Sequence, residues 1–441
     1  MRTGPARPVV VGLAVWAVLV AVATAYPLLT GWDVRTALDP VLPVPPLHAQ
    51  WLPRVGPATV VALLLAAAAL RWAVPLADRL PWRRLVVAAY GAGLVWALAL
   101  AFVDGPEGGL RALGFGSEYL PTARETDDVT AMVREYVDRI PYSHPDNWPI
   151  HVAGHPPAAV LFYVALVRVG LGGTVAAGVV TVALAASIAP AVLVAVRRLG
   201  AEDAARRAAP FLVLSPPVIW YAVSADAMFA AVAAWGLAAL AAAATATRTP
   251  ALVGWSVVAG LLLGTCVMLS YGLPLLGPLA VAVLLLARSW RPLPIVGGVA
   301  LLVVLGFAWW GFAWWEAFPV LRERYLDGIA EERPASYWIW GNLAALAVAC
   351  GPALGAGTGM LVALGRRAAR VPAGLATAAW LALLVADLSG MSKAEVERIW
   401  LPWMPWLLLV TALVPERWRR PLLAAQLATA LLLQHLLNTT W

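Results

Sequence analysis

The sequence predicts an all-α protein, a polytopic bundle of about 13 transmembrane helices. Composition carries most of this prediction, because 62% of the 441 residues are hydrophobic and only 12% are charged. The mean hydropathy is correspondingly high, at +0.80. Apolar runs near 20 residues long also recur along the chain. A helix of that length crosses the ~30 Å hydrocarbon layer of a bilayer and satisfies its own backbone polar groups.

The first apolar run, 8–30, follows Arg2 and Arg7. It is too long for a removable signal peptide and lacks a small-residue cleavage site, so we interpret it as the first span. The run 156–170 is short, and we expect it to lie at the outer surface or dip into it. The other spans are predicted near residues 55–75, 84–103, 173–196, 207–222, 227–246, 251–273, 275–287, 293–314, 339–364, 371–388, 399–414 and 421–437.

The distribution of charge predicts the orientation of these spans. With a cytoplasmic N-terminus, 19 of the 31 basic residues but only four of the 24 acidic residues fall on cytoplasmic segments. This asymmetry follows the positive-inside rule, and it explains the pI of about 9.8 without nucleic-acid binding. We therefore expect a multi-pass protein of the plasma (inner) membrane, with one transmembrane domain over 1–441 and an extracytoplasmic functional face.

Most of the polar sequence falls on that outer face, and the longest polar interval is 117–157. It belongs to a predicted outer segment, 104–170, whose surface helices are expected to form the active site. After Thr126 as N-cap, apolar residues recur at helical spacing and predict an amphipathic helix on the membrane surface. These residues are Val129, Met132, Val133, Tyr136, Val137 and Ile140.

Two kinds of polar residue in this segment allow a structural and a functional interpretation. Asp127 and Asp128 would lie in the first turn of the predicted helix, where carboxylates complement the helix dipole; the alternative is a catalytic role. His144, His151 and His155 could ligate a metal. The chain lacks HExxH, however, and no acid or cysteine stands at a metal-ligand spacing from these histidines. Hydrogen-bonded structural histidines are therefore favoured, and a divalent metal stays possible without assigned ligands.

A resemblance to a known family rests on short motifs in a matching order. His155-Pro156-Pro157 opens an apolar helix after a long acidic outer loop, and this looks like the HPP element of GT-C membrane glycosyltransferases, which include protein O-mannosyltransferases and aminoarabinose transferases. The succession of motifs along the chain is similar to that of actinobacterial integral membrane proteins assigned to that superfamily. These motifs are SEYL, GHPPAAVLFY, GLGG, SYG and SKAEVERIWLPW. The likeness covers most of residues 110–410.

The resemblance implies inverting transfer of a sugar from a polyprenyl phosphate to a glycan, lipid or protein acceptor at the outer face, as in cell-wall biosynthesis. It makes Glu118, beside Tyr119, a candidate for the catalytic base, together with Asp127 and Asp128. A second family acid corresponds to Asp226, in a short outer link. The sequence departs from the family in having no Asp-Glu pair directly after the first span.

The chemistry of such a transfer needs a carboxylate to accept the acceptor's proton and cations to hold the phosphate. Residues 392–400 offer Lys393, the single lysine of the chain, and Arg398. Both are predicted to bind the donor phosphate with His155, although they could instead anchor the chain at the membrane interface. Substrate-binding candidates are Tyr119, His151, Tyr271 and Glu395.

A different class of function is a transporter or a flippase of lipid-linked glycan. It would predict charged or helix-breaking positions near the middle of the membrane and symmetry between the two halves of the chain. The sequence shows no convincing inverted repeat. An intramembrane hydrolase is disfavoured because HExxH and GxSxG are both missing.

Overall fold

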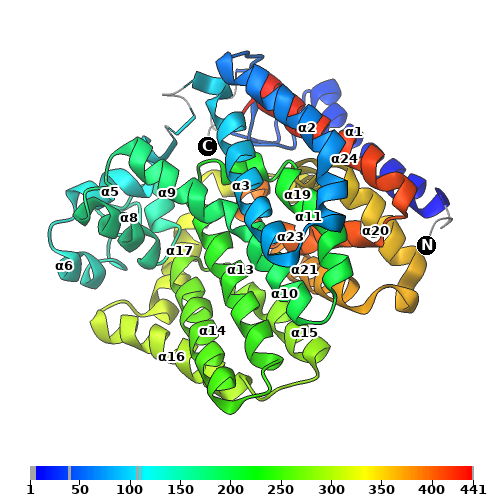
Figure 1. Ribbon diagram of the computed structural model, residues 1–441. Coiled ribbons are helices and arrows are strands. Elements are labelled where there is room, and N and C mark those ends of the chain that lie inside the picture. Colours follow the sequence, from blue (N-terminus) through cyan, green and yellow to red (C-terminus); the bar gives the residue numbers. More distant parts are fainter. Residues whose placement is uncertain (1–5, 38–40, 106–108, 111, 440–441) are drawn as a thin grey trace.

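The computed structural model describes residues 6–37, 41–105, 109–110 and 112–439. Arg2 and parts of the predicted outer segments 31–54 and 104–155 lie outside these residues. The described chain is a bundle of helices, shown in Figure 1, with one small antiparallel sheet in which β1 (Gln50–Trp51) pairs with β2 (Leu437–Asn438). The prediction of an all-α, multi-pass membrane protein is confirmed.

Among the described residues, eight helices are long and apolar enough to cross a membrane. A ninth candidate is a bent pair whose halves meet at 109° across Gly351, which has a φ of +76°. That pair is α19 (Ala335–Cys350) and α20 (Pro352–Leu364). The eight are α1 (Ala6–Thr30), α2 (Pro57–Arg79), α3 (Trp82–Ala101), α9 with α10 (Thr174–Ala186 and Ile188–Arg198), α13 (Ala225–Ala244), α14 (Thr249–Leu269), α16 (Leu293–Trp310) and α21 (Arg370–Leu388).

The remaining predicted spans correspond to shorter, broken or more polar helices. Pro216 and Pro217 separate α11 from α12, because a proline disfavours helical backbone at the residue before it. Length and composition therefore do not decide whether these elements cross, and the count of 13 stays a prediction. The elements are α11 (Glu202–Leu214), α12 (Val218–Tyr221), α15 (Gly277–Ala287), α23 (Met404–Leu407), η5 (Leu408–Leu413) and α24 (Glu416–Leu436).

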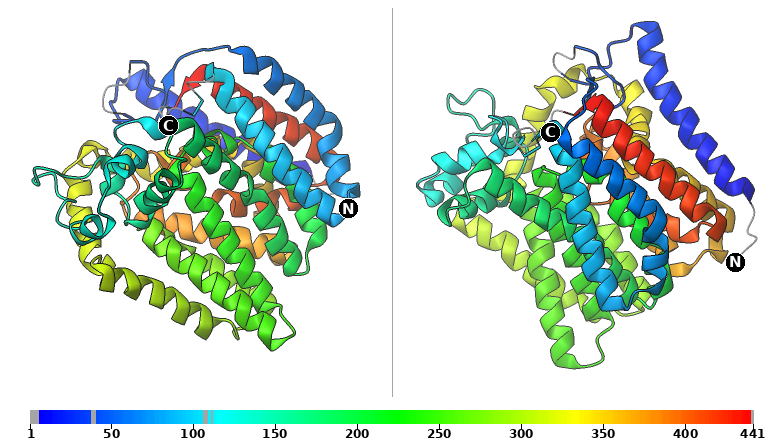
Figure 2. Two further views of the ribbon diagram at one scale, coloured as in Figure 1. Left: turned by 60° about the vertical axis from the view of Figure 1, so that its left-hand side comes forward. Right: turned by 45° about the horizontal axis from the view of Figure 1, so that its top comes forward.

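Helix α13 lies in the middle of the bundle, whereas α1 lies at its edge (Figures 1 and 2). In α13, 89% of the apolar window is buried, against 17% in α1. The alanine-rich sequence of α13 explains its position, since small side chains let neighbouring helices approach closely. Its first turn carries Asp226, which is thereby fixed at one end of the most buried of the eight candidate spans.

The outer segment differs from its prediction. A continuous amphipathic helix starting at Thr126 is wrong: α5 (Tyr119–Glu125) ends there, and α6 (Val129–Arg134) begins after Asp128. The Asp128 carboxylate caps α6 by accepting hydrogen bonds from the backbone of Thr130 and Ala131, at 2.8 and 3.0 Å. The apolar residues that suggested a membrane-facing stripe instead enter the protein core, because Val133, Tyr136 and Ile140 are all fully buried.

Two further short helices follow and carry the histidines, α7 (Ile150–Ala153) and α8 (Ala158–Arg168). The 11 residues of α8 are too few to cross a bilayer as a helix, as the short apolar run suggested. Residues 314–332 form two more helices, α17 (Trp314–Leu326) and α18 (Ile329–Glu332). Arg324 of α17 joins this part of the chain to 104–170 by donating to the carbonyls of Ile140 and Trp148, the latter at 2.7 Å.

Helices α1 and α20 cross at glycines that leave no space for a side chain. A Cβ atom added at Gly12 would collide with the carbonyl oxygen of Gly355, whereas one added at Gly254 in α14 would meet nothing within 4 Å. Gly12→Leu should therefore lower the thermal unfolding midpoint of the purified protein, with a cost of about 1–3 kcal/mol from overpacking. The matched change Gly254→Leu should leave the midpoint unchanged or raise it, because it removes a flexible glycine from a helix. Equal midpoints for the two variants would contradict this packing.

Candidate active site

A cavity of about 420 Å³ lies where residues 150–155 and helix α17 meet the ends of several other helices. Its walls come from 150–155, the start of α13, 270–275, α17 and 385–403. Five of the residues singled out from sequence line it: His151, His155, Asp226, Tyr271 and Arg398. Segments that are more than 200 residues apart in the chain thus line one cavity.

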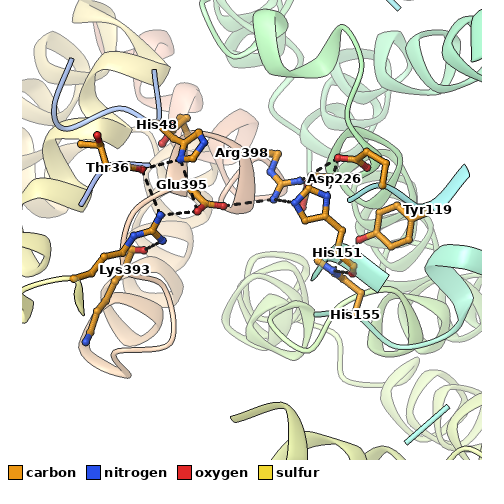
Figure 3. Close-up of polar contacts among 12 residues, drawn as sticks. Thr36, His48, Tyr119, His151, His155, Asp226, Lys393, Glu395 and Arg398 are labelled. Atoms are coloured by element: carbon orange, nitrogen blue, oxygen red, sulfur yellow. Dashed lines mark hydrogen bonds and ion pairs between the residues drawn. The ribbon is translucent and has the colours of Figure 1, made fainter. Parts of the chain in front are cut away.

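Arg398 is the charged centre of this cavity and is 3% exposed. Its Nη1 atom lies 3.3 Å from Asp226 Oδ2 and 4.0 Å from Glu118 Oε1, and its Nη2 atom lies 3.8 Å from Glu395 Oε2 (Figure 3). Burial alone would lower the pKa of Arg398, but Asp226, Glu118 and Glu395 raise it above its usual range. The guanidinium therefore stays charged, and it holds three carboxylates around it.

His151 links Arg398 to Glu118. Its Nε2 atom lies 3.3 Å from Arg398 Nη2, and its Nδ1 atom lies 2.8 Å from Glu118 Oε1. Because a guanidinium can only donate, Nε2 must accept, and the ring proton then sits on Nδ1, facing the carboxylate. Burial would raise the pKa of Glu118, but His151 and Arg398 outweigh it and hold that pKa below its usual range.

His155 lies on the turn that Pro156 and Pro157 set at the start of α8. Its Nδ1 atom is 2.8 Å from the Tyr119 hydroxyl and 2.9 Å from the carbonyl oxygen of His151. Burial lowers the pKa of His155 to about 4 and raises that of Tyr119, so both side chains are neutral near pH 7. Tyr119 stacks on Tyr163 at 5.8 Å, which fixes its ring.

A strained turn positions Glu395 and, three residues later, Arg398. Ala394 and Glu395 have φ angles of +67° and +61°, a left-handed conformation that costs a non-glycine residue roughly 1–3 kcal/mol. Two side chains hold the turn: Asn342 Oδ1 accepts from the backbone of Ala394 at 3.1 Å, and Arg333 donates to Glu395 at 2.7 Å. Burial would raise the pKa of Glu395, but Arg333, His48 and Arg398 lower it to about 2.

Glu397 is fully buried behind this turn. Its Oε1 atom accepts a hydrogen bond from the backbone of His48 at 2.7 Å, which ties the first outer loop to the segment that carries Arg398. The His48 ring reaches the carbonyl of Thr36 at 2.7 Å and lies 3.8 Å from Glu395. Burial raises the pKa of Glu397 to about 7.

Other predicted site residues lie outside the cavity wall. Glu118, Tyr119 and Glu395 stand behind it, in contact with residues that line it. The Lys393 ammonium donates to the carbonyl of Ala330 at 2.9 Å and points away from Arg398 (Figure 3). Asp127 and Asp128 line a separate polar cleft of about 540 Å³.

Three contributors were missed from sequence: His48, Arg333 and Asn342. Nothing in their neighbourhood marks them, because each acts through a contact with a residue 50 or more positions away. His48 offered the one available signal, as one of only five histidines in the chain. Among the described residues, no group of three or more His, Cys, Asp and Glu side chains could hold a metal ion.

No protein-family model and no curated protein matches this sequence. A comparison with solved structures finds a crystal structure of ArnT from Cupriavidus metallidurans in the apo state. The TM-score is 0.45 and the sequence identity 18%, over 75% of this chain. This chain spans only 59% of that protein. A similarity this distant does not assign a function, so the site must be judged from its own residues.

The buried carboxyl of Glu397 predicts a pH dependence that a variant can isolate. With a pKa of about 7 in the folded state and an ordinary value in the unfolded chain, the folded protein binds more protons between these two values. The extra proton on Glu397 stabilises the folded protein. This contribution to the free energy of unfolding is complete below about pH 4.5 and is lost as the pH rises through 7. Glu397→Gln keeps an acceptor for His48 and should gain on the order of 2–3 kcal/mol relative to the wild type between pH 5 and pH 8. Thermal unfolding midpoints at both pH values test this, and parallel profiles would contradict it.

Proposed function

We propose that the protein is an inverting glycosyltransferase that transfers a sugar from a polyprenyl phosphate to a cell-envelope glycan, lipid or protein. The transfer would occur at the extracytoplasmic face of the plasma membrane. The observation that carries the proposal is that a buried guanidinium, Arg398, and a buried carboxylate, Asp226, lie 3.3 Å apart and line the same cavity. These are the two groups that such a transfer requires.

In the proposed reaction, an acceptor hydroxyl attacks the anomeric carbon on the face opposite the lipid phosphate. The new C–O bond forms as the bond to the phosphate oxygen breaks, and the electron pair leaves with the phosphate. Asp226 accepts the hydroxyl proton, because it is the predicted catalytic acid that lines the cavity. Arg398 stabilises the charge that develops on the phosphate, and its planar fork suits two phosphate oxygens.

The other predicted residues take supporting roles in this proposal. Glu118, 5% exposed, orients His151 through the 2.8 Å contact and keeps Nε2 turned towards Arg398. His155 Nδ1 donates to the carbonyl oxygen of His151, so the ring can donate to the phosphate through Nε2 only when it is protonated, with Tyr119 fixing its orientation. Lys393 can join the phosphate only by leaving the carbonyl of Ala330.

Asp127 and Asp128 are the weakest candidates for the base. Both belong to the separate cleft, and Asp128 already caps α6 through the backbone of Thr130 and Ala131. A group must come within hydrogen-bond reach of the proton it accepts. Asp226 meets that condition in the cavity without a rearrangement of the outer segment.

The remaining walls of the cavity suit a lipid-linked sugar. Trp314 and Phe318 stack at 5.2 Å, and Tyr271 lies 5.7 Å and 5.9 Å from them. Aromatic rings offer apolar faces to a sugar, and we assign Tyr271 and His151 to substrate binding on this basis. The aliphatic part of the wall, including Leu273 and Leu275, suits a prenyl chain.

The alternative of a transporter or flippase predicts ionisable residues deep in the spans. Within the eight described spans, the buried carboxylates are Asp226 and Asp387. Asp226 is in the first turn of α13 and Asp387 in the last turn of α21. Because these buried acids lie at helix ends and not in the middle of the spans, they favour a transferase that acts at one face of the membrane over a transporter.

Purified protein given radiolabelled polyprenyl-phosphate mannose, arabinose, glucose and galactose should bind and consume one of these donors, with release of the polyprenyl phosphate. Consumption in the presence of a crude envelope extract would then identify the acceptor by its label. Failure to bind or consume any donor would overturn the proposal. A cavity found open alternately to both sides of the membrane would favour the transporter instead.

Variants of the cavity should separate the proposed roles. Asp226→Asn should lower kcat by about 10²- to 10⁴-fold with donor binding retained, because it removes the base while Glu118 and Glu395 still compensate the charge of Arg398. Arg398→Lys should cost about 10²- to 10³-fold, since a lysine keeps the charge but not the fork. The control is Asp138→Asn, which changes an exposed carboxylate in segment 104–170 and should leave transfer unchanged. Undiminished transfer by Asp226→Asn would move the role of base to Glu118, which Glu118→Gln tests.

A further inference from the structure

A second cavity, of about 530 Å³, is a groove between α1, α20 and α21. It shares no lining residue with the candidate active site. Its walls are almost entirely apolar and include Val15, Leu19, Leu354 and Val362. Val15 is 62% and Val362 77% exposed, so the groove opens sideways from the bundle. Because α1 and α21 are candidate spans, that opening faces the hydrocarbon of the membrane.

The glycine crossing of α1 and α20 explains why a groove exists. The backbones meet where Gly12 lies against Gly355 and Pro8 against Gly359, so the two helices run in opposite directions. Beside this contact, Trp16 donates to the carbonyl of Ala347 at 2.7 Å and closes one wall. Leu343 and Ala347 of α19 and Trp380 of α21 complete the lining, and about 530 Å³ between these helices is left unfilled.

Positive charge gathers at one end of the groove. Arg7 lines that end, and the antiparallel crossing brings the C-terminal end of α20, with the exposed Arg366 and Arg367, to the same side. The sequence holds no acidic residue in 1–32 or in 351–386, the parts of the chain that contain these three arginines. This end of the groove therefore presents cations without carboxylates from its own helices to neutralise them.

Two polar groups in the groove have no hydrogen-bond partner among the described residues. They are the hydroxyl of Thr358 and the indole N–H of Trp380, and both atoms are buried. Thr358 is adjacent to Gly359 and is therefore within about one helical turn of the level of Pro8 and Arg7. An unpaired donor in an apolar environment is costly, so turning the two side chains towards carbonyl acceptors of a bound molecule would be favourable.

We propose that this groove binds one acidic phospholipid. Its phosphate lies at the end formed by Arg7, Arg366 and Arg367, and an acyl chain fills the apolar walls. Its ester carbonyls accept hydrogen bonds from Thr358 and Trp380 once these side chains turn towards the groove. A zwitterionic phospholipid fits the walls but gains less from the cations, and a polyprenyl phosphate has no glycerol esters. The site is therefore specific for the combination of negative charge, ester carbonyls and acyl chain.

The full chain, purified in mild detergent and exchanged into equal amounts of phosphatidylcholine and phosphatidylglycerol, would be examined by native mass spectrometry. The wild type should retain phosphatidylglycerol in preference to phosphatidylcholine. Arg7→Gln should reduce that preference about fivefold, the effect expected for one cation near a lipid headgroup. Ala363→Trp, which fills the groove, should abolish retention of either lipid, and Thr358→Val should weaken retention of both.

The matched control is Arg83→Gln, which removes an exposed arginine that does not line the groove and should leave retention unchanged. Lipid retention would be compared only among variants that elute as a single species in size-exclusion chromatography. If Ala363→Trp disturbs folding, the comparison of Arg7→Gln with the wild type decides whether the groove binds an acidic lipid. Equal retention of the two lipids by the wild type would overturn the proposal. So would an equal loss in Arg7→Gln and Arg83→Gln, or displacement of phosphatidylglycerol by undecaprenyl phosphate.

Discussion

The burial of the Arg398 guanidinium is the constraint on which the rest of the site depends. A buried cation without partners would cost several kcal/mol, so the fold must bring carboxylates to it. It does so with Asp226 from the first turn of α13, Glu118 from the position just before α5, and Glu395 from the turn just before α22 (Val396–Ile399). Each acid comes from a different region of the chain, and the cavity lies where they converge.

The same constraint explains why the turn before Arg398 is strained. A left-handed Ala394 and Glu395 are unfavourable on their own, yet they point the Glu395 carboxylate at both Arg333 and Arg398. Asn342 holds the turn by accepting from Ala394 and by donating to Asp387 at 2.8 Å. Strain of this kind persists only where surrounding contacts determine the backbone, and such positions concentrate at functional sites.

The two cavities show how helix packing in a membrane creates binding space. Small residues let the helices approach where Gly12 meets Gly355, and they build the enclosed centre around α13. Away from such contacts, cavities remain between the helices. The candidate active-site cavity contains buried charged groups and suits chemistry. The groove beside α1 has exposed cations at its rim and suits a lipid headgroup.

The sequence by itself determined the helical, membrane-spanning architecture, because the length of an apolar run and the cost of unpaired backbone groups in lipid leave few alternatives. It also located His151, His155, Asp226 and Arg398, since polar residues in an apolar chain are conspicuous. It could not show which acid pairs with Arg398, because that depends on contacts between segments more than 100 residues apart. Nor could it show that the helix after Thr126 is broken, since helical spacing of apolar residues also arises when consecutive turns pack into a core. Only the tertiary structure decided these points, because long-range contacts determine both the pairing of buried charge and the face that each short helix buries.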